Sequence, residues 1–263
     1  MEIQKLQDSV SIKKVSEKDN VGNFSIEGLY TGYGLTIGNA LRRVLLSSIP
    51  GAAIIQVKIK GVSHEFSTLQ GMVEDMIELS LNLKRVRLKI HTDEPQTLML
   101  KVKGEKEVTA ADIKTTTFVE VINPDCKIAT LTKKNSELDM EIVAERGLGY
   151  LPSDQRKMGR LPVGTIMLDA IYTPIRRVDF KIEDMRVGER TNYNRINIEV
   201  ETDGSVSPGE AVQTSLIILK EHYEKILDTD IFPIEESQPE EENPKKKKVT
   251  AKKTAKKTTV KKK

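Results

Sequence analysis

Residues 35–48 read LTIGNALRRVLLSS, and this stretch carries the clearest helical pattern in the chain. Its apolar residues recur every three or four positions and form one stripe: Ile37, Ala40, Leu41, Val44 and Leu45. Arg42, Arg43 and Leu46 lie off that stripe, with Leu46 nearly opposite to it. The spacing predicts a helix with one buried face. Its outer face suits either an ordinary exposed surface or a docking site for another protein, and periodicity alone does not decide between the two.

A second helix is predicted from about Thr68 to Leu83. Apolar residues repeat the spacing of the first helix there, at Leu69, Met72, Val73, Met76 and Ile77. Ser67 or Thr68 is placed to cap its start, because hydroxyl side chains accept hydrogen bonds from the first free backbone amides of a helix.

A third helix is predicted from about Pro208 to Leu227. It starts with an S-x-x-E capping box at Ser207 and Glu210 and has proline at its first position. Its apolar residues step by four and three over two heptads, at Val212, Leu216, Leu219, Tyr223 and Ile226. That spacing is typical of a helix–helix seam, although a stripe facing the core of the same chain explains it equally well.

Six further segments alternate apolar and polar residues, as half-buried strands do. They are Ile55–Ile59, Val86–Ile90, Leu98–Val102, Leu138–Ile142, Val178–Ile182 and Ile196–Val200. Polar residues on the alternate face indicate mainly antiparallel sheets with one exposed side. The predicted fold class is therefore α+β, with a body rich in strands.

The composition excludes several classes of protein. The chain has 263 residues, 38% of them hydrophobic, which suffices for one large domain or two small ones. No segment approaches the roughly 18 uninterrupted apolar residues of a membrane span, and the start lacks the basic-then-apolar layout of a secretory signal. A single cysteine, Cys126, excludes a disulfide framework or thiolate zinc cluster within the chain. We expect a cytoplasmic protein without a membrane partner.

The charge is divided sharply along the chain. Residues 244–263 hold 11 lysines and no acidic residue, whereas the rest holds 31 of the 42 basic residues and all 39 acidic ones. Residues 233–263, an acidic hinge and a lysine-rich tail, are predicted to be disordered because they contain almost no apolar residues. Such a tail is either a solvated appendage or binds DNA or RNA phosphates without sequence specificity. The lysines concerned are Lys245, Lys246, Lys247, Lys248, Lys252, Lys253, Lys256 and Lys257.

The chain contains no motif typical of a catalytic or metal site. Gly32, Gly34 and Gly38 lack the spacing of a dinucleotide-binding loop, and a tight entry into the first helix explains them better. The three histidines are far apart and in no ligand spacing. We therefore expect no catalytic residue, metal or cofactor in this chain, which has the pattern of a scaffold.

Five multi-residue motifs occur in order along the chain: GLTIGNALRR (34–43), VKIKGVSHEFSTLQGMVEDMIELSLNLK (57–84), ERGLGYLPS (145–153), LDAIYTPIRRVDF (168–180) and GERTNYNRINIEVETDGSVSP (188–208). Together they resemble the amino-terminal domain of bacterial-type RNA polymerase alpha subunits. The resemblance covers residues from about 10 to 230, and ordered matches of this length are far more specific than an isolated motif.

The resemblance implies a discontinuous fold. Residues 1–50 and 175–232 would form a dimerisation subdomain with two long helices packed on a sheet, and residues 51–174 an inserted strand-rich subdomain. Two copies would pair through the helices, and the dimer would recruit the beta and beta-prime subunits for transcription of DNA into RNA. The alpha pair would not touch the nucleotides being joined, so Mg²⁺ is expected on the catalytic partner subunit.

The resemblance also assigns residues to three contact surfaces. Those facing the beta subunit would be Arg42, Arg43, Leu46, His64, Glu65, Ser67 and Thr68. Those facing the beta-prime subunit would be Lys84, Arg190, Thr191 and Asn194. The dimer interface would combine the two helical stripes, at Ile37, Leu41, Val44, Leu45, Val212, Leu216, Leu219, Tyr223 and Ile226.

The chain departs from the family after Ile234. Bacterial alpha subunits usually carry a small helical domain there that binds upstream promoter DNA and activators, and the hinge and tail occupy its place. We therefore do not expect this subunit to recognise promoter sequences. We expect only non-specific DNA binding through the tail. Two rival interpretations remain. The chain could be a stand-alone nucleic-acid-binding protein that acts through its tail, or an enzyme that acts on small molecules, although no motif supports the second.

Overall fold

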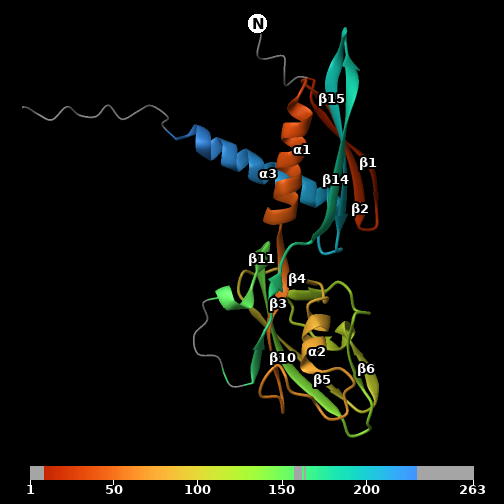
Figure 1. Ribbon diagram of the computed structural model, residues 1–263, viewed down its shortest axis with the longest axis vertical. Coiled ribbons are helices and arrows are strands. Elements are labelled where there is room, and N and C mark those ends of the chain that lie inside the picture. The colour runs from red at the N-terminus through yellow and green to blue at the C-terminus, as the bar shows by residue number, and fades with distance from the viewer. Residues whose placement is uncertain (1–8, 157–161, 163, 230–263) are drawn as a thin grey trace, which may run out of the picture. The chain divides into compact units, whose positions relative to one another are not determined.

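The structure is a computed structural model and describes residues 9–156, 162 and 164–229. In the described residues three α-helices are interspersed among runs of strands, and every strand pair is antiparallel (Figure 1). The predicted α+β class is therefore confirmed. No helix in these ranges is long and apolar enough to cross a membrane.

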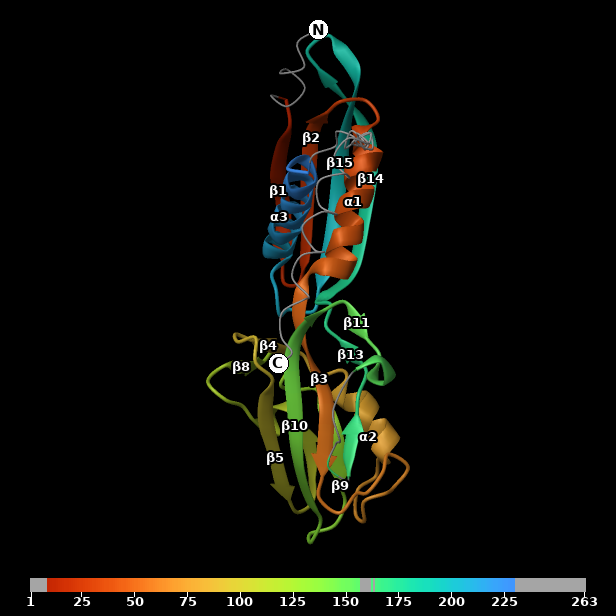
Figure 2. The ribbon, with the colours of Figure 1, turned by 90° about the vertical axis from the view of Figure 1, so that its left-hand side faces the viewer.

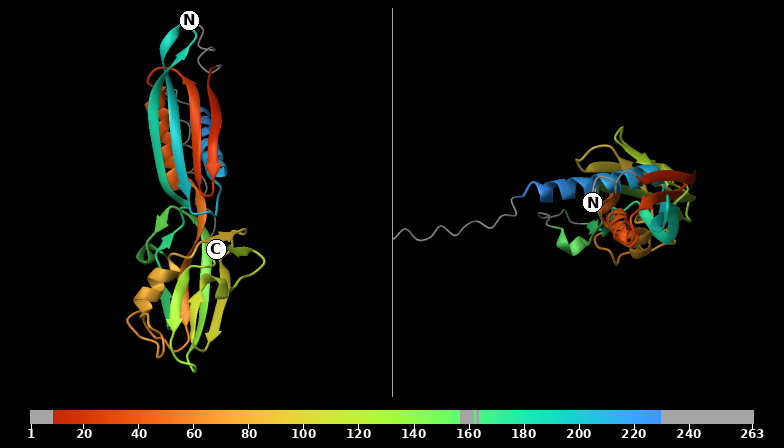
Figure 3. Two further views of the ribbon diagram at one scale, coloured as in Figure 1. Left: turned by 90° about the vertical axis from the view of Figure 1, so that its right-hand side faces the viewer. Right: turned by 90° about the horizontal axis from the view of Figure 1, so that it is seen from above.

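A four-stranded sheet brings the first strands of the chain together with residues 175–202, in the order β1-β2-β15-β14. Two helices cover one of its faces (Figures 2 and 3). Leu41 and Val212 from these helices pack in one core with Ile196 and Ile198 of the sheet. The elements are β1 (Ser11–Lys18), β2 (Val21–Leu29), β14 (Ile175–Val187), β15 (Arg190–Thr202), α1 (Tyr33–Ser48) and α3 (Pro208–Leu227).

The helix predicted over residues 35–48 is confirmed as α1, which begins two residues earlier. Its N-cap, Gly32, has a φ of 88°, a conformation that favours glycine. Gly38 is buried against β14, and a Cβ built on it would lie 2.7 Å from the ring of Phe180. Gly32 therefore allows the tight entry into the helix that was predicted, and Gly38 allows a close approach to β14 that was not.

The predicted third helix is confirmed as α3 with the predicted bounds. Its capping box is formed on both sides. The Ser207 N–H donates to Glu210 Oε2 at 3.2 Å, and the Glu210 N–H donates to Ser207 Oγ at 3.2 Å. Since these bonds involve neighbouring residues only, the start of this helix is determined locally.

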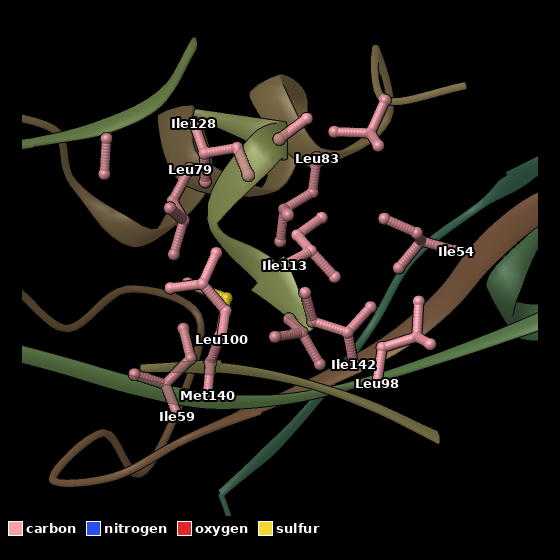
Figure 4. Close-up of a cluster of buried hydrophobic side chains, with 14 of the residues drawn as sticks. Ile54, Ile59, Leu79, Leu83, Leu98, Leu100, Ile113, Ile128, Met140 and Ile142 are labelled. Carbon is pink, nitrogen blue, oxygen red and sulfur yellow. The ribbon is translucent and has the colours of Figure 1, made fainter. Parts of the chain in front are cut away.

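A second sheet has five strands in the order β12-β3-β10-β5-β7. Ile142 pairs with Val57 on one side and with Leu98 on the other, so all three share one face. They are fully buried, and Leu79 and Leu83 of the adjacent helix lie in the same core (Figure 4). The elements are β3 (Pro50–Ile59), β5 (Gln96–Lys103), β7 (Ile113–Lys114), β10 (Glu137–Leu148), β12 (Thr165–Met167) and α2 (Met76–Leu83).

The helix predicted over residues 68–83 is wrong in its first half, because α2 begins only at Met76. Its cap is Asp75, whose carboxylate accepts the backbone N–H three residues on at 2.7 Å, and not a hydroxyl at 67–68. Gly71 lies before it with a φ of 83°, and Met72 forms an isolated β-bridge. Leu69 and Met72 thus pack against the core from a non-helical turn, although their sequence spacing is that of a helix.

The six predicted strands are confirmed, although the segment 86–90 is shortened to β4. Neither β1 nor β2 was predicted. β1 is exposed along nearly its whole length. In β2 only Phe24 and Ile26 alternate with polar residues, and the glycines on either side keep this pattern short. The remaining elements are β4 (Leu88–Ile90), β6 (Lys106–Thr109), β8 (Val119–Val121), β9 (Lys127–Leu131), β11 (Tyr150–Leu151), β13 (Ala170–Ile171), η2 (Ala110–Asp112) and η3 (Ser153–Gln155).

Candidate subunit-docking surfaces

The outer face of α1 carries three side chains that are not buried in the core. Arg42 and Arg43 are exposed, and Leu46 is 39% exposed, whereas Leu41 and Leu45 in the same turns are fully buried. The two faces that periodicity predicted are confirmed. Neither arginine forms an ion pair with another described residue, so both guanidinium groups are open to carboxylates of another molecule.

The HEFST segment forms an exposed turn. The Ser67 N–H donates to the carbonyl oxygen of His64 at 3.2 Å, and the Ser67 hydroxyl donates to the same oxygen. His64, Glu65 and Thr68 are exposed, and Ser67 is half-buried. Phe66, which the motifs did not single out, is 73% exposed. An aromatic ring within a polar segment was the signal available in the sequence, since such rings are enriched at interfaces.

The region of α2 also presents an apolar face to solvent. Val73, Ile77 and Leu81 are 66%, 46% and 53% exposed and follow one another at four-residue spacing. The prediction that Val73 and Ile77 belong to the buried stripe is wrong. Met76 of the same stripe is buried, and so is Leu79, which the predicted stripe did not include. Two apolar stripes interleave in this segment, and only the position of the helix on the sheet decides which one is covered.

Lys84, which follows α2, is engaged in an ion pair within the chain. Its Nζ lies 2.8 Å from Asp169 Oδ2, and Asp169 Oδ1 accepts the N–H of Ser153 at 2.9 Å. The hydrogen bond from Lys84, followed by that from Ser153, lowers the pKa of Asp169 to about 2. The carboxylate is therefore ionised at neutral pH. Asp169 was not predicted, because it lies 85 residues from Lys84 in the sequence.

The remaining predicted beta-prime-facing residues are on the β14–β15 hairpin. Arg190 and Thr191 are exposed, but Asn194 is only 8% exposed. Its Oδ1 accepts the N–H of Gly32 at 2.9 Å, and its Nδ2 donates to Asp184 Oδ1 at 3.2 Å. Asn194 therefore holds the start of α1 against β14, and we remove it from the set that faces a partner.

The predicted self-contact residues divide into two groups. Leu41, Leu45 and Val212 are 0%, 0% and 3% exposed in the core of the chain itself, so they offer no surface to a second copy. The other six are half-buried or exposed: Ile37, Val44, Leu216, Leu219, Tyr223 and Ile226. Exposure rises along α3, from 38% at Leu216 to 57% at Tyr223. The helix thus begins in the core and leaves it after Leu219, which still packs partly against it.

Two of the motif segments are joined by a partly buried polar network. The Tyr172 hydroxyl donates to Glu145 Oε1 at 2.5 Å, and Arg156 Nη2 donates to the Tyr172 oxygen at 2.7 Å. Burial, followed by the hydrogen bond to Glu145, raises the pKa of Tyr172, which therefore stays protonated. This network stabilises the fold rather than supplying a base.

Groups that could support chemistry are few. In the ranges that the structure describes, no three His, Cys, Asp or Glu side chains gather closely enough to hold a metal ion. Burial raises the pKa of the Cys126 thiol, so this thiol is not activated as a nucleophile. The eight predicted DNA-binding lysines, Lys245 to Lys257, lie outside the described residues. What these ranges do present is charged and apolar surface suited to protein docking.

Comparison with known proteins finds similar chains that cover most of this sequence. Residues 57–173 match the family model described as the RNA polymerase Rpb3/RpoA insert domain. The chain is 50% identical over 229 residues to the DNA-directed RNA polymerase subunit alpha of Symbiobacterium thermophilum, which covers 86% of this chain and 72% of that protein. The subunits of the same name from Oceanobacillus iheyensis and Limosilactobacillus reuteri are 49% and 46% identical over 209 and 220 residues, covering 80% and 83% of this chain and 66% and 70% of those proteins.

Proposed function

Because this chain belongs to the family of bacterial-type DNA-directed RNA polymerase alpha subunits, we propose that it is the homodimeric scaffold on which the beta and beta-prime subunits of that enzyme assemble. Its role is in transcription, as one subunit of a nucleotidyltransferase. The observation that carries the scaffold role is the division of α1 into a buried inner face and an open outer face with two arginines.

The proposed dimerisation subdomain consists of residues 1–50 and 175–232, and the proposed inserted subdomain of residues 51–174. Three hydrophobic clusters in the described residues support this division. One draws on residues 24–49 and 175–212. The other two, one on residues 54–168 and a smaller one on Ala53, Ile55, Ala170 and Tyr172, lie within residues 51–174. Residues 57–173, which match the insert-domain family model, fall inside the proposed insertion.

The proposed dimer contact uses the open part of the two helical stripes. Leu216, Tyr223 and Ile226 of α3 are 38–60% exposed, and Ile37 and Val44 of α1 are half-buried. Covering apolar side chains by a second copy removes them from water, and this is the main driving force of such association. Leu41, Leu45 and Val212 support the contact from beneath, by holding both helices on the sheet.

The proposed beta-facing surface combines Arg42, Arg43 and Leu46 with the exposed HEFST turn. An apolar side chain between arginines is a typical composition for the energetic centre of an interface. Phe66 adds an apolar side chain, 73% exposed, to the HEFST part of the proposed surface.

The proposed beta-prime-facing surface uses Lys84, Arg190 and Thr191. Because a symmetric dimer presents every surface twice, one copy would engage the beta subunit and the other the beta-prime subunit. The two positive side chains suit acidic groups on that partner.

We propose that the chain itself supplies no catalytic residue and binds no cofactor, and that a partner subunit holds the Mg²⁺ that nucleotidyl transfer requires. Within residues 9–156, 162 and 164–229, no three His, Cys, Asp or Glu side chains gather closely enough to hold a metal ion. We propose that the chain acts in the bacterial cytoplasm, where the DNA is transcribed.

A second proposed function concerns the lysine-rich tail. Its 11 lysines without acidic residues favour non-specific binding to DNA phosphates. No aromatic side chain lies among residues 244–263, so base stacking would not contribute.

Purification of the tagged full-length chain from its native cells tests the assembly role. Two large subunits should co-purify, and sedimentation of the free chain should give a dimer at micromolar concentration. A stand-alone nucleic-acid-binding protein would instead bring nucleic acid alone, and nuclease treatment would leave the chain without partners. A folded monomer without large partners would overturn the proposal.

A further inference from the structure

Lys84, Asp169 and Ser153 form a junction of three segments that are far apart in the sequence. Lys84 is the C-cap residue of α2, Asp169 lies between β12 and β13, and Ser153 is the first residue of η3. The two oxygens of the Asp169 carboxylate bind different segments, Oδ2 the Lys84 ammonium at 2.8 Å and Oδ1 the Ser153 N–H at 2.9 Å. A carboxylate held on both oxygens has little freedom to rotate, so it fixes the ammonium in one place.

Lys84 nevertheless keeps capacity for a partner. An ammonium group has three N–H donors, and the described contacts use only the one directed at Asp169. The side chains of Lys84 and Asp169 are 23% and 32% exposed, so the pair lies at the surface. A carboxylate of another protein can therefore bind the ammonium without displacing Asp169.

Holding this side chain in advance has an energetic consequence. Lysine carries large rotamer entropy, and its ordering at an interface reduces the affinity of the complex. A lysine that is already ordered in the free subunit avoids that loss on docking. We propose that Asp169 is a positioning residue for beta-prime docking, because it orders the Lys84 ammonium before the partner arrives. This inference rests on the proposed function, which alone assigns Lys84 to the beta-prime contact.

The opposite effect is physically possible and makes the idea testable. The Asp169 carboxylate also offsets the positive charge of Lys84. If the charge of Lys84 mattered more than its position, removing the carboxylate would strengthen the attraction of acidic groups on the partner. The sign of the change in affinity therefore separates positioning from neutralisation.

The test is a titration of purified beta-prime subunit into complexes of beta with full-length alpha dimers. Asp169→Asn should weaken beta-prime binding roughly three- to tenfold when Lys84 is present. In a Lys84→Ala background the same change should have no further effect, because the residue acts through Lys84. The free energy of unfolding of every alpha variant is measured in parallel.

Ser153 offers a matched pair of variants. Ser153→Pro removes the N–H that holds Oδ1, at the first position of η3 and after a residue with extended backbone, where proline fits. It should weaken beta-prime binding in the same direction as Asp169→Asn. Ser153→Ala keeps the N–H and removes only the hydroxyl contact to Asp169, so it should weaken beta-prime binding less than Ser153→Pro does.

The outcomes separate the two levels of the argument. If Lys84→Ala leaves beta-prime binding unchanged, Lys84 is not part of that surface, and the positioning role fails with it. If Lys84→Ala weakens binding but Asp169→Asn does not weaken it, or strengthens it, the docking proposal stands and the positioning role is overturned. An equal effect of Asp169→Asn in both backgrounds would show a structural role and would also overturn it.

Discussion

Replacing Arg43 by alanine should separate partner binding from folding. Arg43 is exposed on α1, and it forms no ion pair with another residue in the described ranges. Alanine is the best helix former, so the helix loses no intrinsic stability. The free energy of unfolding of the Arg43→Ala dimer should therefore lie within about 0.5 kcal/mol of the wild-type value.

Binding of the beta subunit should respond much more strongly. A guanidinium group offers five N–H donors in a planar fork, which suits bidentate contact with a carboxylate. Truncating such an anchor at the centre of an interface costs about 2 kcal/mol or more. That free energy corresponds to an increase of about thirtyfold in the Kd for beta.

The assay combines a titration of purified beta into immobilised alpha dimers with chemical denaturation of the same dimers. Arg186→Ala is the matched control, because Arg186 is an exposed arginine on β14 outside the proposed beta-facing set. The control should bind beta with wild-type affinity. The reasoning is refuted if Arg43→Ala dimers also bind beta with wild-type affinity, or if they lose binding only because they no longer fold.

Four further outcomes are expected. Replacing Leu216 and Leu219 together by aspartate should turn the dimer into a monomer in sedimentation, since charges would enter an apolar contact; a persistent dimer would contradict this. Gly38→Ala should lower the Tm, because its Cβ would lie 2.7 Å from an aromatic ring of β14, and overpacking costs about 1–3 kcal/mol. The pKa of Asp169 is lowered from 3.8 to about 2, so its stabilisation is complete above pH 3.8 and is lost as the pH falls through about 2. The unfolding free energies of wild type and Asp169→Asn should therefore converge over that range, and a constant difference would exclude this linkage. Truncation after Ile234 should reduce DNA affinity at low salt and flatten its salt dependence on two unrelated sequences alike, whereas equal affinities with and without the tail would reject the role of the lysines.

The amino-acid sequence by itself determined the elements whose signals are local. α1 and α3 were predicted because their apolar residues repeat with helical period, over about two and a half turns in α1 and about four in α3. The Ser207–Glu210 capping box acts between neighbouring residues. Strands with strict alternation, such as the segment around Ile142, were predicted for the same reason. The outer face of α1 followed directly from its inner one, because a helix turns by a constant angle at each residue.

Tertiary structure alone decided which of several possible faces is buried. Residues 68–75 have helical spacing but reach the core from a turn around Gly71, and the exposed stripe with Ile77 became apparent only once α2 lay on its sheet. Contacts between distant segments were equally invisible in the sequence. The Asn194 side chain accepts a hydrogen bond from the Gly32 N–H of the same chain. Asp169 forms an ion pair with Lys84, which lies 85 residues away in the sequence. Periodicity and capping arise from neighbouring residues, whereas burial and ion pairing depend on which distant segments the folded chain brings together.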